Sequence, residues 1–249
     1  MRTLSLLLLT FLTCFDAHSQ NKIFLSARYS IRYTQNGKVV LADECRLLVT
    51  ETMSYFYSLN KIRYRAYLEK KLAAAAQNGG AVNFSAEESS MLVNFLPFGI
   101  LKKYKQDQSV FIEELEDQAY GYVKDTTLRR HWVLSSDTMT INNLFCHKAS
   151  YKTKDSLEVT AWYTTAVAVG EGPFSYYGLP GLIVSVRNNR GWASELVGFD
   201  DAATQKWAPP SYLPTTESKL AAAKENNRRM LLGGQTSGAK TTLEKKKDE

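Results

Sequence analysis

Cys146 and His147 are adjacent in the sequence and are the first candidates for chemistry, because a thiol beside an imidazole can act as a nucleophile. The other histidines are His18 and His131, so a site built from several histidines is excluded. No HExxH, CxxC or GxSxG motif occurs. Adjacent side chains of a strand point to opposite faces, which separates Cys146 from His147 if both lie in a strand. A structural role for Cys146 is therefore favoured, with a nucleophilic thiol as the alternative.

Acidic residues cluster at Glu113, Glu114, Glu116 and Asp117. Neighbouring acids raise one another's pKa and can serve acid–base catalysis. Strand alternation spreads them over two faces, and charges on an edge strand also discourage aggregation. We therefore predict no catalytic residues, no metal site and no cofactor.

The stretch "GPFSYYGLPGLI", residues 172–183, is rich in glycine, proline and aromatic residues. No lysine follows its glycines and a strand-like run comes next, so a phosphate-binding loop is not expected. We predict a rigid strand entry that is buried at Leu182 and Ile183 and most open at Tyr176 and Tyr177. Its structural residues are Gly172, Pro173, Gly178, Leu179, Pro180, Gly181, Leu182 and Ile183. The candidate surface for a partner or ligand is Trp162, Tyr163, Phe174, Tyr176 and Tyr177, with simple core packing as the alternative.

The elements that must position these residues are mostly strands. Around residues 28–33, Tyr29, Ile31 and Tyr33 alternate with arginines and a serine, which indicates a half-buried strand. Asn36-Gly37 predicts a tight hairpin turn. Further strands are predicted at 38–50, 54–58, 110–116, 118–124, 132–134, 145–151, 157–163 and 182–187, with a turn at 135–137.

Helices are predicted in two places. Helix formers run from residue 63 to Gly79-Gly80, and Ser85 to Glu88 forms a capping box for a second short helix. After Pro214, residues 217–232 predict a C-terminal helix followed by a disordered basic tail. The expected fold is a β-rich α+β domain over 20–216, with a curved or partly closed antiparallel sheet, a helical insertion at about 61–96, and a helix and tail over 217–249.

The N-terminus predicts export. Arg2 precedes a largely apolar run from Leu4 to Phe15, and Ala17-His18-Ser19 is a small-x-small cleavage signal. We interpret residues 1–19 as a cleaved signal peptide, and no later segment is apolar enough to span a membrane. From Lys219 onward eight lysines and arginines stand against four acids, so +4 of the +6 net charge lies in the tail. We therefore expect no nucleic-acid partner.

Cys45 and Cys146 remain after cleavage, an even number in an oxidising compartment. A disulfide between them is the favoured prediction. The alternative is two separate buried thiols.

The chain resembles the GLPGLI family of exported bacterial proteins. Gly178-Leu179-Pro180-Gly181-Leu182-Ile183 matches the motif that names the family. Upstream, Trp132, Ile141, Cys146 to Ala149, Ala161 to Thr164 and Gly172-Pro173 follow in the family's order, and Ser54, Phe56 and Ser58 resemble an earlier element. Two positions depart from the pattern: Val167-Ala168 stands in place of an Ile-Pro pair, and Leu157-Glu158 in place of an arginine.

The resemblance implies an envelope-associated protein, often near outer-membrane TonB-dependent uptake systems, without established biochemistry. We expect a non-catalytic binding or accessory protein in the periplasm or on the periplasmic face of the outer membrane, with secretion as a further destination. Its expected partner is an outer-membrane receptor or another envelope protein. The alternatives are an envelope hydrolase or thiol-dependent enzyme, and a purely architectural protein.

Overall fold

The computed structural model describes residues 22–80, 82–85, 88, 95–125, 130–205 and 207–233. The predicted signal peptide, most of the predicted second helix and the basic tail lie outside these residues. The elements are β1 (Leu25–Gln35), β2 (Lys38–Val49), β3 (Met53–Ser58), α1 (Leu59–Asn78), β4 (Phe98–Lys103), β5 (Gln108–Leu115), β6 (Gln118–Asp125), β7 (Val133–Ile141), β8 (Leu144–Lys152), β9 (Glu158–Thr164), β10 (Leu182–Asn188), β11 (Trp192–Asp200), η1 (Ala202–Thr204), β12 (Leu213–Pro214) and α3 (Glu217–Gly233).

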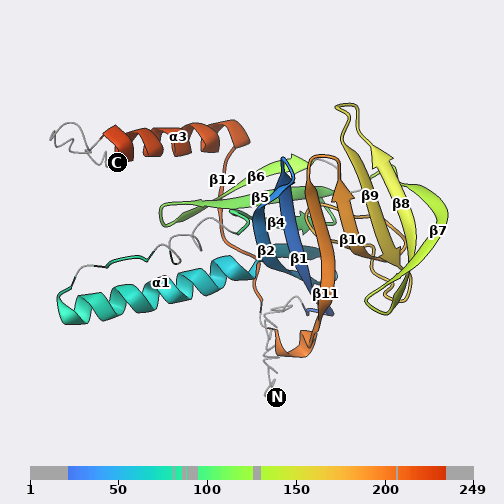
Figure 1. Ribbon diagram of the computed structural model, residues 1–249, viewed down its shortest axis with the longest axis horizontal. Helices are drawn as coiled ribbons and strands as arrows, with labels where there is room; N and C mark the ends of the chain where they lie inside the picture. Colours follow the sequence, from blue (N-terminus) through green and yellow to red (C-terminus); the bar gives the residue numbers. More distant parts are fainter. Residues whose placement is uncertain are drawn as a thin grey trace, which may run out of the picture.

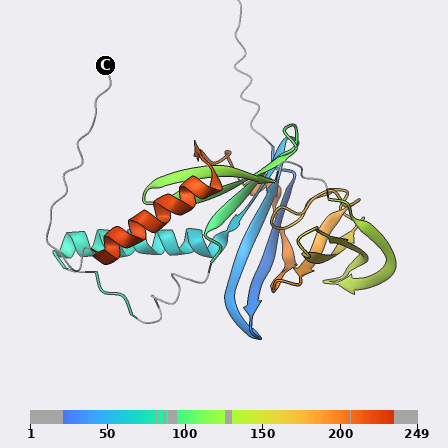
Figure 2. The ribbon, with the colours of Figure 1, turned by 90° about the horizontal axis from the view of Figure 1, so that it is seen from above.

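The strands form one open sheet in the order β12-β6-β5-β4-β3-β2-β1-β11-β10-β9-β8-β7. Neighbouring strands are antiparallel except β12 and β6, which are parallel, so the sheet is mixed. The predicted β-rich α+β class is confirmed, and the sheet does not close into a barrel. Figures 1 and 2 show it twisting strongly between β4–β6 at one end and β7–β9 at the other.

Local signals set several of the boundaries. Asn36 and Gly37 both have positive φ, at 50° and 72°, which confirms the predicted hairpin turn. Ser58 caps α1 by accepting a hydrogen bond from the Lys61 N–H, and Gly79 ends the helix in the left-handed conformation. Ser85 and Glu88 exchange the two reciprocal bonds of a capping box. The turn predicted at 135–137 is wrong, because β7 continues through it with an irregularity in its pairing.

Helices α1 and α3 extend from the β6 side of the sheet and lie largely outside its core (Figures 1 and 2). Leu220 of α3 is buried in the main core cluster, together with Tyr29, Phe56, Ile100 and Leu182. A second cluster lies under the β8–β10 region around Ile183. No helix among the described residues is both long and apolar enough to cross a bilayer.

Candidate functional site

The connection between β9 and β10 carries the "GPFSYYGLPGLI" stretch and folds back on itself. Gly178 N–H donates to the Gly170 carbonyl at 2.8 Å, and Ile183 N–H donates to the Glu171 carbonyl at 2.8 Å. Gly178 has a φ of 95°, which side chains disfavour. At Gly181 a Cβ atom would lie 2.0 Å from the Thr164 carbonyl oxygen. Both glycines are therefore required by this backbone path.

A buried lysine holds the loop. Lys102 of β4 is 0% exposed, and its Nζ lies 2.5 Å from Glu171 Oε2, itself 1% exposed. The same Nζ donates to the carbonyls of Gly172 at 2.9 Å and Tyr176 at 3.1 Å. Tyr104 Oη donates to Glu171 Oε1 at 2.7 Å. Lys102 thus contacts the loop on both sides of residues 173–175, at Glu171 and Gly172 before them and at Tyr176 after them, and holds this segment in place.

Phe174 lies between the two Lys102 contacts at Gly172 and Tyr176 and has a φ of 53°. A bulky residue in this left-handed region is an outlier that costs about 1–3 kcal/mol and persists only when its surroundings enforce it. Its ring contacts the rings of Phe56 at 5.4 Å, Trp192 at 5.6 Å and Tyr176 at 6.1 Å between centroids. The loop therefore presents the Phe174 ring in an enforced position.

Phe174 lines a cleft of about 620 Å³ between β4–β6 and the β9–β10 loop. The lining residues are Pro97, Phe98, Phe111, Glu113, Tyr122, Lys124, Arg130, Tyr151, Thr153, Leu157, Phe174, Ser175, Tyr176, Asn188 and Trp192. The volume falls within the usual range of about 300–1,000 Å³ for ligand pockets, and aromatic and other apolar residues together form most of the walls. This cleft is the candidate functional site.

The charged groups of the cleft are held within the protein. Glu113 accepts a hydrogen bond from Tyr122 Oη at 2.8 Å and pairs with Lys224 of α3. Lys124 lies over the Phe111 ring at 5.2 Å and pairs with Glu217 of α3 at 2.9 Å. Helix α3 therefore neutralises one wall of the cleft.

At the other wall, Arg130 donates to Ser175 Oγ at 3.3 Å. This bond connects Arg130 to the β9–β10 loop at the edge of the cleft.

Only part of the predicted surface reaches the cleft. Phe174 and Tyr176 line it, although Tyr176 is only 9% exposed. Tyr163 is buried and contacts the His147 ring, and Trp162 packs against the main core. Tyr177 is half-buried and stacks on Tyr104 outside the cleft lining. Leu182 and Ile183 are fully buried, as predicted.

The predicted disulfide is wrong. Cys45 and Cys146 are both free and buried. They lie in β2 and β8, which β1, β11, β10 and β9 separate in the sheet. Sequence reasoning could not see this separation because it depends on strand order.

Burial raises the pKa of both thiols, and it raises the pKa of Cys45 well above the ordinary value of a thiol. The reactive thiolate is therefore disfavoured at both cysteines. Cys146 is fully buried, whereas His147 contacts the exposed Phe145 ring. Alternation along β8 thus separates the two, as predicted.

The predicted acidic cluster is also divided by alternation. Glu113 lines the cleft, whereas Glu114 pairs with Lys61 at 3.1 Å and Arg65 at 2.9 Å near the start of α1. A different buried acid, Asp43, accepts hydrogen bonds from Leu96 N–H and Ser58 Oγ. Burial raises the pKa of Asp43.

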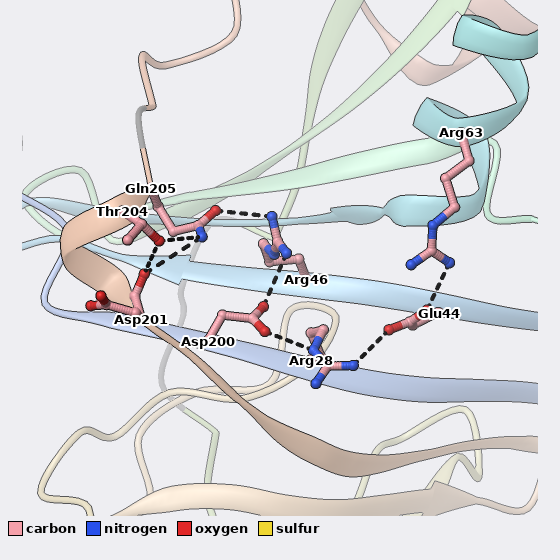
Figure 3. Close-up of polar contacts among 8 residues, drawn as sticks. All are labelled: Arg28, Glu44, Arg46, Arg63, Asp200, Asp201, Thr204 and Gln205. Carbon is pink, nitrogen blue, oxygen red and sulfur yellow. Dashed lines mark hydrogen bonds and ion pairs between the residues drawn. The ribbon is translucent and has the colours of Figure 1, made fainter.

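A polar network that the sequence did not reveal covers β1, β2 and β11 (Figure 3). Its members are Arg28, Glu44, Arg46, Arg63, Asp200, Asp201, Thr204 and Gln205. Arg28 bonds to Asp200 at 2.8 Å and to Glu44 at 3.1 Å, and Arg46 pairs with Asp200 at 3.0 Å. Its arginines are thus matched by carboxylates, which indicates a structural clamp.

Sequence reasoning also missed Lys102 and most of the cleft walls. Lys102 follows Ile100 by two positions, so it shares the buried face of β4. A charged residue on an apolar face is a detectable signal for a buried partner. The cleft walls come from strands far apart in the sequence and gave no such signal.

Comparison with known protein families finds a match over the segment that contains the β9–β10 loop. A family model described as "Protein of unknown function (Porph_ging)" matches residues 150–185, which contain β9 and the whole loop. No curated protein matches the chain. Over this segment the chain is similar to a family of unknown function.

Solved structures give a likeness of fold. "Structure of PNGF-II in C2 space group" is similar with a TM-score of 0.51 and 12% identity, over 82% of this chain and 33% of that one. PNGF-II in space group P21 gives 0.49 and 12%, over 80% and 32%. An uncharacterized conserved protein from Thermus thermophilus gives 0.37 and 6%, over 78% and 91%. The chain spans about a third of PNGF-II, and the likeness concerns the fold alone.

Proposed function

We propose that this chain is an exported, GLPGLI-type envelope protein that uses the aromatic cleft to bind an extended segment of a partner protein. It acts without catalysis in the periplasm or at the periplasmic face of the outer membrane. The observation that carries the proposal is that the segment matched by the family model supplies much of the cleft wall. Six lining residues fall inside the family-matched segment: Tyr151, Thr153, Leu157, Phe174, Ser175 and Tyr176.

The walls favour a polypeptide segment with apolar side chains. Glu113 and Lys124 already have partners on α3, so aromatic surface supplies most of the available contact. Aromatic rings bury large areas at little entropic cost and dominate recognition surfaces. The enforced position of Phe174 means that its ring does not have to be ordered when a ligand binds. An outer-membrane receptor, including one of a TonB-dependent uptake system, fits this role.

Site-specific photo-crosslinking in intact envelopes tests the proposal. A benzophenone-bearing phenylalanine analogue replaces Leu157 at the cleft, and in a matched control it replaces Val197, which is 51% exposed on β11 and outside the cleft lining. We expect a discrete protein adduct from position 157 and none from position 197. Equal adducts from both positions, or none from position 157, would contradict the proposal. A glycan adduct from position 157 would also contradict it, because the ligand of the cleft would then be a carbohydrate and not a polypeptide.

The competing thiol-enzyme hypothesis gains no support from the two cysteines. Both are buried, and burial raises the pKa of each thiol, so neither is poised as a nucleophile near neutral pH.

A further inference from the structure

Two arginines stand apart from the other arginines of the described residues. Those with a carboxylate partner are Arg28, Arg46, Arg63, Arg65, Arg190, Arg228 and Arg229. Arg130 bonds to Ser175. Within the described part of the chain, Arg32 and Arg187 have neither an ion pair nor a hydrogen bond through their side chains, and both are exposed.

Sheet register places these two arginines on either side of one small residue. Ala193 of β11 pairs with Arg32 of β1 and with Arg187 of β10. Strands lie about 4.8 Å apart, so the two Cα atoms are about 10 Å apart across the sheet. Both long side chains can therefore converge above Ala193.

The neighbouring row is polar. Glu195 pairs with Ser30 on one side and with Ser185 on the other. The two rows line a hollow of about 380 Å³. Alternation along β11 directs Ala193 to the face opposite Trp192, which lines the aromatic cleft, so the hollow and the cleft are separate sites.

We propose that this hollow binds the phosphate ester of a polyol, such as a sugar phosphate. Paired guanidinium forks match phosphate oxygens and neutralise their charge. A bound phosphate also relieves the repulsion between the two guanidinium groups, neither of which has an ion-pair partner among the described residues. The Glu195 carboxylate repels an anion in its own row but accepts hydrogen bonds from hydroxyl groups, which orients the ligand with its phosphate between the arginines.

Calorimetric titration of the purified chain at low salt tests the site with inorganic phosphate, glucose 6-phosphate and glucose. We expect glucose 6-phosphate to bind more tightly than phosphate, and glucose not to bind. Arg32→Gln and Arg187→Gln should each weaken glucose 6-phosphate at least about tenfold. Arg190→Gln removes the same charge from a nearby residue that pairs with Asp155, and should change affinity less than about twofold.

Glu195→Gln tests the role of the Glu195 row separately from that of the two arginines. It should retain phosphate binding and reduce the preference for the sugar ester to within about twofold of phosphate. Flotation with vesicles of phosphatidylglycerol, against phosphatidylcholine alone, distinguishes the two sources of the ligand. If the wild type binds phosphatidylglycerol vesicles and Arg32→Gln does not, the phosphate belongs to a lipid headgroup. If the wild type binds glucose 6-phosphate but not the vesicles, and Arg32→Gln loses this binding, the phosphate belongs to a soluble ester.

Two results would overturn the proposal. One is an equal loss of binding in Arg190→Gln, which would mean that only net charge matters. The other is no saturable binding of phosphate, glucose 6-phosphate or phosphatidylglycerol vesicles, with the soluble probes taken to about 10 mM. The side chains at these positions are exposed, so the substitutions are not expected to unfold the chain, and unchanged circular dichroism melting curves check that directly.

Discussion

Replacing Lys102 by methionine tests whether the buried ion pair holds the β9–β10 loop. Methionine has a similar volume and no charge, so the change leaves the Glu171 carboxylate buried without its cation. Removing one partner of a buried pair costs about 3–5 kcal/mol of the free energy of unfolding. For a chain of this size that lowers Tm by about 6–20 °C.

A second substitution separates charge burial from simple loss of packing. In Lys102→Met combined with Glu171→Gln, neither buried charge remains, so we expect recovery of about half of the lost stability or more. The carbonyls of Gly172 and Tyr176 still lack their donor, which leaves part of the loss in place.

Urea unfolding followed by far-UV circular dichroism and tryptophan fluorescence measures both variants. Lys152→Met is the matched control, because its ion pair with Glu158 is 62% and 58% exposed and is worth at most about 1 kcal/mol. The reasoning is refuted if Lys102→Met costs no more than this control. It is also refuted if the double variant is no more stable than the single one.

Further expectations follow from the other buried groups. Gly181→Ala should destabilise the fold by about 1–3 kcal/mol, because the Thr164 carbonyl is backbone and cannot move aside; an unchanged melting temperature would contradict this. Alkylation followed by mass measurement should label Cys45 and Cys146 in denaturant but neither in the native state, whereas failure to label in denaturant without reductant would indicate a disulfide. Because burial raises the folded-state pKa of Asp43, the wild type should gain stability relative to Asp43→Asn as pH falls towards the ordinary value of about 3.9, and lose it as pH rises through the raised pKa. Urea unfolding at several pH values checks the sign, and a flat or inverted difference would show that Asp43 is not penalised by burial.

Much of the local structure followed from short-range signals. The Asn36-Gly37 turn, the Gly79 helix stop and the start of α3 at Glu217 each depend on backbone preferences of a few residues. Strand alternation likewise divided Glu113 from Glu114 between two surroundings. These features needed no knowledge of which strands pair.

Other features depended on contacts between distant segments. β4 and β11 were not predicted, because alternation between apolar and polar residues is weak in both sequences. The 135–137 segment has turn-forming residues, yet pairing with β8 keeps it in a strand.

The sequence by itself determined the β-rich class, the Asn36-Gly37 hairpin turn, the end of α1 and the start of α3, and the need for glycine in the β9–β10 loop, because these depend on local sterics and periodicity. Only the tertiary structure decided that two cysteines stay apart, that Lys102 is buried against Glu171, and that Arg32 and Arg187 flank Ala193. Strand order and register set those distances, and both arise from the packing of the whole sheet.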